Sequence, residues 1–85
     1  MNDKVYILLD IVDSKAEQVA RVLRESPGVV MADVVEGPPD VVIVLEAPYR
    51  EQLAKLTIQA LALAETLVEQ VRLLPSIDRL NHIGT

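Results

Sequence analysis

Two short apolar runs joined by a turn are the clearest structural signal in this chain. Residues 29–36 and residues 41–46 are rich in β-branched side chains, and Gly-Pro-Pro-Asp at residues 37–40 consists of turn formers. The pattern predicts two strands joined by a hairpin. Alternate residues of a strand face opposite sides of its sheet, and the second run is apolar on both sides. A chain of 85 residues can cover one side of a small sheet with its own helices, so we expect a partner subunit on the other.

The segment before this hairpin predicts a strand and then a helix. Residues 5–12 form an apolar run that is again largely apolar on both sides. Ser14 and Glu17 match a capping box, in which each side chain bonds the other residue's backbone amide, and so they predict a helix start. Pro27-Gly28 ends this helix with a turn. Its predicted inner face consists of Ala16, Val19, Ala20 and Leu23.

A second helix is predicted after the third strand. Ala47-Pro48 opens it, with the proline where a missing amide costs nothing, and the ring of Tyr49 is expected to pack under the sheet edge. Helical spacing can be traced onward to Leu74, but we prefer a break near Ala64 and a fourth strand at about residues 67–74. A fourth strand would cover a sheet edge that three strands leave open. The predicted inner stripe of the helix is Leu53, Leu56, Ala60 and Leu63.

The order β-α-β followed by β-α-β is the split unit of ferredoxin-like folds. We therefore predict an α+β sandwich, βαββαβ, whose four-stranded antiparallel sheet carries two helices on one face. Two such chains are expected to assemble as in a dimeric α/β barrel. One domain is predicted over residues 1–75, followed by a polar C-terminal tail at residues 76–85.

Composition narrows the function classes. Eight Lys and Arg against thirteen Asp and Glu give a net charge of −5, which opposes direct binding to nucleic acid. The chain has no cysteine, so thiolate nucleophiles and cysteine-ligated metals are excluded. The first apolar run is too short to span a membrane and no signal-peptide pattern precedes it, so we expect a cytoplasmic protein without membrane contact.

Two loop motifs resemble those of the effector domain of Lrp/AsnC transcriptional regulators, the RAM domain. Residues 26–30, Ser-Pro-Gly-Val-Val, correspond to a Pro-Gly-Val turn into the second strand, and residues 36–41 contain a Gly-x-x-Asp hairpin at similar spacing. The resemblance spans residues 5–75. Pro39 stands where the family often has an aromatic residue, and Thr66 is similar in position to a threonine near the start of the family's fourth strand.

The resemblance implies a function in transcription regulation by amino-acid sensing. RAM domains pair their sheets into dimers, assemble further into rings such as octamers, and bind amino acids or related metabolites where dimers meet. We therefore expect a small-molecule effector-binding and oligomerisation domain without its own helix-turn-helix. Its expected partners are further copies of itself, an amino-acid-type ligand and a full-length Lrp/AsnC regulator.

The hairpin supplies the candidate ligand-binding residues. Gly37 lets a ligand approach the backbone, and the Asp40 carboxylate can pair with an amino group. Pro39 adds rigidity, and Glu36 and Thr66 are weaker candidates. The alternative is a plain turn in which the glycine supplies its φ and the aspartate bonds local amides.

Other functions have less support in the sequence. Asp10 and Asp13 are two carboxylates without a third ligand, and the single histidine, His82, lies in the tail, so we predict no metal site, no cofactor and no catalytic residues. A cofactor-independent α/β-barrel enzyme would need an acid or base, for which the strands offer mainly Asp33 and Tyr6. An ACT-type amino-acid sensor and a purely structural oligomerisation module are the remaining alternatives.

Overall fold

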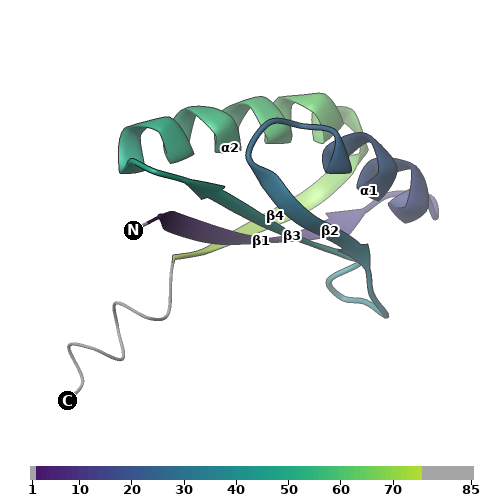
Figure 1. Cartoon of the computed structure of the whole chain (residues 1–85). Helices are drawn as coiled ribbons and strands as arrows, with labels where there is room; N and C mark the ends of the chain where they lie inside the picture. Colours follow the sequence, from purple (N-terminus) through teal and green to yellow (C-terminus); the bar gives the residue numbers. More distant parts are fainter. Residues whose placement is uncertain (1, 76–85) are drawn as a thin grey trace, which may run out of the picture.

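The structure, a computed structural model, describes residues 2–75, and the predicted tail with His82 lies outside the described residues. All neighbouring strands are antiparallel and the sheet order is β2-β3-β1-β4, with both helices on one face (Figure 1). The predicted ferredoxin-like fold is confirmed. The elements are β1 (Asp3–Ile11), α1 (Ala16–Arg24), β2 (Val29–Val34), β3 (Val41–Ala47), α2 (Arg50–Ala64), a 3-10 turn η1 (Glu65–Leu67) and β4 (Val68–Pro75).

The core lies between the sheet and the two helices. The central strands β1 and β3 supply most of it, with Ile7, Leu9, Ile43 and Leu45 fully buried. Burying each of these side chains contributes about 1.5 to 3 kcal/mol to folding. Opposite them, α1 buries Val19, Ala20 and Leu23 as predicted, and Ala16 is half-buried. The helix-facing side of the central strands is thus closed by this chain alone, whereas Val71 and Leu73 on the same side of the edge strand β4 are 39% and 49% exposed.

The second helix ends where the sequence predicted. It stops at Ala64, and after η1 the chain enters β4, so the continuous helix to Leu74 does not form. Leu63, predicted to face inward, is 56% exposed. The buried line runs from Ala60 to Ala64, four residues on, and Leu63 points about 100° away from it.

The start of α2 differs from the prediction. The helix begins at Arg50 with Tyr49 as its N-cap, so Pro48 precedes the first turn instead of forming part of it. The Tyr49 side chain is 71% exposed and does not pack under the sheet edge. The Tyr49 backbone is extended, as is typical of a helix N-cap.

The capping box predicted at Ser14 is absent. Lys15 is the N-cap of α1 and no side chain bonds the free amides there. The Lys15 amide donates to the Val12 carbonyl, and this tight turn holds Asp13 and Ser14 at φ values of 50° and 58°. A capping residue needs extended backbone, which Ser14 does not have. The match to the motif was therefore wrong because the turn at the end of β1 governs this segment.

Gly28 combines two requirements that a larger residue cannot meet. Its φ is +86°, and an added Cβ would lie 2.6 Å from Cδ1 of Leu56 on α2. We expect Gly28→Ala to lower the free energy of unfolding by about 1 to 2 kcal/mol from backbone strain alone, and by more if Leu56 has to move. Urea denaturation at fixed protein concentration measures the change, with the exposed Glu25→Ala as control. Equal midpoints for the two variants would contradict it.

Candidate functional site

The candidate ligand-binding residues of the hairpin lie at one end of the sheet. The loop between β2 and β3 projects from the end of the sheet that lies furthest from the N-terminus (Figure 1). Glu36 and Gly37 are exposed, whereas Pro39 and Asp40 are half-buried. The hairpin therefore has an outer part open to solvent and an inner part held against the sheet.

Asp40 attaches this hairpin to the central strand β1. Its carboxylate Oδ2 accepts a hydrogen bond of 2.8 Å from the amide of Ile11, 29 residues away in the sequence. Its own amide donates to the Leu9 carbonyl at 2.8 Å, and its carbonyl accepts from the Val35 amide at 2.9 Å. The aspartate thus bonds backbone groups, as the plain-turn alternative predicted, but its carboxylate reaches a distant strand instead of a local amide.

Gly37 is required by space, not by its φ. Among the described glycines only Gly28 has a positive φ. A Cβ on Gly37 would overlap Oδ1 of Asp40, and it would lie 2.8 Å from the carbonyl oxygen of Pro39. The glycine therefore makes room for the Asp40 carboxylate, and this packing fixes the shape of the loop.

Thr66 lies on the other side of the same strand end. It is exposed in η1, next to Leu67, whose carbonyl accepts a hydrogen bond of 2.9 Å from the Val12 amide. The end of β1 is thus held by Asp40 at Ile11, and the next residue, Val12, is held by the segment of Thr66. The hairpin and Thr66 share one end of the sheet, with the end of β1 between them.

The remaining candidate residues do not form a catalytic or metal-binding cluster in the part of the chain described. Residues 2–75 contain no group of three or more side chains that could hold a metal ion. Asp33 and Tyr6 lie on β2 and β1, which β3 separates. No helix within the same residues is both long and apolar enough to cross a membrane.

The sheet face away from the helices carries a row of apolar side chains across all four strands. Residues paired in an antiparallel register point to the same face, and the pairs here connect four large side chains in line. Val44 within this row is only 8% exposed because its neighbours cover it. We call this set the apolar row: Met31, Val44, Tyr6 and Leu74.

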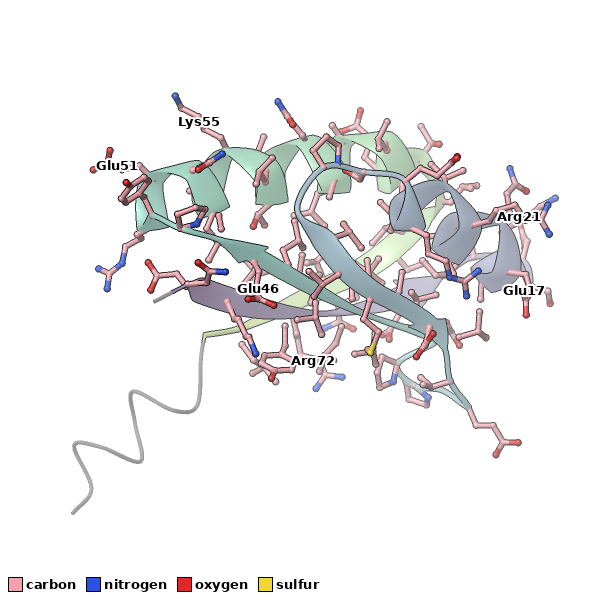
Figure 2. The ribbon with its side chains drawn as sticks, viewed as in Figure 1. Glu17, Arg21, Glu46, Glu51, Lys55 and Arg72 are labelled. Carbon is pink, nitrogen blue, oxygen red and sulfur yellow. The ribbon has the colours of Figure 1, made fainter. Side chains whose placement is uncertain are left out.

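A second row beside it is apolar in the middle and charged at both ends. Val42 and Leu8 form its centre and are half-buried. Its ends are Asp33 on the edge strand β2 and Arg72 on the edge strand β4. Figure 2 shows Arg72 on the side of the sheet away from the helices. We call this set the mixed row: Asp33, Val42, Leu8 and Arg72.

No protein-family model matches the sequence, and no curated protein does. Solved structures with the same fold do match. The hypothetical protein PHS023 from Pyrococcus horikoshii has a TM-score of 0.78 at 21% identity, over 91% of this chain and 90% of that one. FFRP-DM1 has a TM-score of 0.76 at 20% identity, over 88% of this chain and 99% of that one.

A longer protein contains the same fold as one of its parts. An AsnC family transcriptional regulator from Agrobacterium tumefaciens has a TM-score of 0.72 at 15% identity, over 89% of this chain but 50% of that one. The neighbours of this ferredoxin-like fold therefore include both proteins of similar length and a transcriptional regulator of about twice the length.

Proposed function

We propose that this chain is a small-molecule effector-binding and oligomerisation domain of the Lrp/AsnC regulator type. The observation that carries the proposal is the hairpin held against the end of β1 by Asp40, at the same sheet end as Thr66. The fold shared with an AsnC family transcriptional regulator supports it. The ligand class is an amino acid or a related metabolite.

The ligand would bind the solvent-facing side of the hairpin. Glu36 and the threonine hydroxyl of Thr66 are exposed and offer acceptor and donor groups. One carboxylate oxygen of Asp40 is used by Ile11, so a ligand amino group would share this carboxylate with the strand. Binding there would alter the end of β1, because Asp40 joins the hairpin to that strand. A change at this strand would shift the population of assembled forms.

Regulation, in this proposal, runs through assembly and not through catalysis. The face of the sheet away from the helices would pair with that of a second copy, because the apolar row is left partly exposed in one chain. Dimers would associate further into rings such as an octamer or join a full-length regulator. Asp33 and Tyr6, the acid or base candidates of an enzyme, lie on strands that are not neighbours.

A thermal-shift screen of the standard amino acids tests the ligand. A true ligand at about 100 times its Kd adds about 2.7 kcal/mol of apparent stability, which raises the Tm of a domain this size by roughly 10 °C or more. We expect Thr66→Val to reduce this shift without altering the unliganded Tm, since Thr66 is exposed. The exposed Lys55→Ala on the outer side of α2 (Figure 2) is the control. A panel that gives no shift at millimolar concentrations would contradict the ligand class.

A further inference from the structure

The charges at the two ends of the mixed row are not paired with each other or with another described residue. Asp33 and Arg72 are exposed on opposite edge strands, three strand spacings apart, which is about 14 Å. Among residues 2–75 neither side chain makes an ion pair or a hydrogen bond. Opposite charges therefore flank an apolar centre. If the same row of a second copy faces this row in the opposite order, each charge meets a charge of opposite sign.

Only one orientation of the symmetry axis brings these opposite charges together. Two sheets that face each other can be related by a two-fold axis parallel to the strands, which reverses the strand order across the interface. Then β2 faces the partner's β4, and β3 faces the partner's β1. Asp33 meets the partner's Arg72, Arg72 meets the partner's Asp33, and Leu8 packs on the partner's Val42.

The neighbouring rows fit the same operation. In the apolar row Met31 would meet the partner's Leu74, and Val44 would meet the partner's Tyr6. Apolar side chains would therefore contact only apolar side chains. Lys4 and Glu46 are register partners on β1 and β3 beyond the apolar row. Reversal of the strand order sets Lys4 against the partner's Glu46, which adds a second kind of opposite-charge contact.

A two-fold axis perpendicular to the strands fits less well. With that axis between the two rows, each strand faces its own copy, so Arg72 would meet the partner's Leu74 and Asp33 the partner's Met31. The charged ends would then lose water without gaining a counter-charge, which costs free energy.

The hairpin end limits how far the contact with the parallel axis extends. Asp10 and Asp40 are neighbours across β1 and β3 at this end. Reversal of the strand order across the interface would set the Asp10 carboxylate against the carboxylate of the partner's Asp40. The Asp40 carboxylate is turned onto the Ile11 amide. The contact is accordingly centred on the apolar and mixed rows, which leaves the hairpin end open for a ligand.

We propose that, in the sheet-to-sheet dimer, Asp33 of each copy bonds to Arg72 of the other, and that these charges select the orientation with the two-fold axis parallel to the strands. The proposal rests on the assembly part of the proposed function and is independent of the ligand. Such pairs contribute modestly to affinity at a solvated rim, but reversal of one member creates two like-charge contacts per dimer.

Charge reversal in two separate proteins tests this orientation. In a dimer of Arg72→Glu both contacts place Asp33 against a glutamate, and in a dimer of Asp33→Arg both contacts place an arginine against Arg72. Each variant should therefore dimerise roughly ten-fold more weakly than the parent. Mixed together, the two variants form a heterodimer in which both contacts are again opposite in charge. Native mass spectrometry should show the heterodimer well above the statistical half. The double variant D33R/R72E should dimerise as the parent does.

Control variants separate this proposal from the proposed function. Glu51→Arg and Lys55→Glu make the same charge changes on the outer side of α2 (Figure 2) and should leave assembly unchanged. Statistical mixing of the two sheet variants, with the parent still dimeric, overturns the orientation and leaves the dimer standing. A parent that is monomeric at micromolar concentration overturns both. Circular dichroism confirms that each variant is folded, since both residues are exposed.

Discussion

Leu8→Lys is expected to convert the assembled protein into folded monomers. Leu8 is half-buried at the centre of the mixed row, on the face away from the helices, and so it contributes nothing to the core between sheet and helices. In a face-to-face dimer each new lysine would lie unpaired in an apolar contact. An uncompensated buried charge costs about 3 to 5 kcal/mol, so the dimer Kd should rise at least about a hundred-fold.

Light scattering after gel filtration, over a range of concentrations, measures this change. The control is Ile58→Lys on α2, because Ile58 is 68% exposed on the helix layer and outside the proposed interface. We expect Ile58→Lys to keep the parent's mass and both variants to keep the parent's circular dichroism. If Ile58→Lys dissociates the protein and Leu8→Lys does not, subunits associate through the helices, and the assembly proposed for the sheet face is wrong.

The fold was predictable because periodicity reports which side of an element is buried. The alternation of Ile7 and Leu9 with Tyr6 and Leu8 marks β1 as a central strand, and the buried side of α1 follows helical spacing. The end of α2 at Ala64 was also predicted, from the need to cover a sheet edge. In each case the pattern extends over several residues, so the prediction averages over local irregularities.

Predictions that depended on one residue's conformation were less successful. Ser14 matched a capping motif, but the turn at the end of β1 gives it a positive φ. Leu63 was predicted to face inward because it follows Ala60 by three residues, but the next buried residue of the helix is Ala64, which follows Ala60 by four. Such choices depend on where the chain enters the packed layer, which tertiary contacts decide.

The candidate site was located by its motif, but its internal bonding was not predictable. The hydrogen bond from Ile11 to Asp40 joins residues far apart in the sequence, and a backbone amide leaves no mark on the residue that carries it. The pairing of Asp33 with Val42, and of Leu8 with Arg72, likewise depends on register. Only the structure shows that the opposite charges of Asp33 and Arg72 lie at the two ends of the same row.

Asp40→Ala is expected to destabilise the fold as well as any ligand complex. Removal of the carboxylate leaves the half-buried Ile11 amide without its acceptor, at a cost of about 1.5 to 3 kcal/mol. With a slope of about 1 to 2 kcal/mol per M for a small domain, the urea midpoint should fall by roughly 0.8 to 3 M. Measurements at one protein concentration are needed because assembly itself adds stability. A midpoint equal to the parent's would show that water replaces this hydrogen bond at no cost.

Asp40→Asn separates the structural role of this side chain from ligand recognition. The asparagine carbonyl oxygen can still accept from the Ile11 amide, so most of the stability lost in Asp40→Ala should be retained. The negative charge is gone, however, and a ligand amino group loses its charge-assisted bond, which lowers affinity by about ten-fold to a hundred-fold. Titration calorimetry with an amino acid from the thermal-shift screen measures the affinity, and urea denaturation measures the stability. If Asp40→Asn binds that amino acid as tightly as the parent, Asp40 serves only to hold the hairpin against β1, and recognition of the amino group belongs to Glu36 or to another part of the chain.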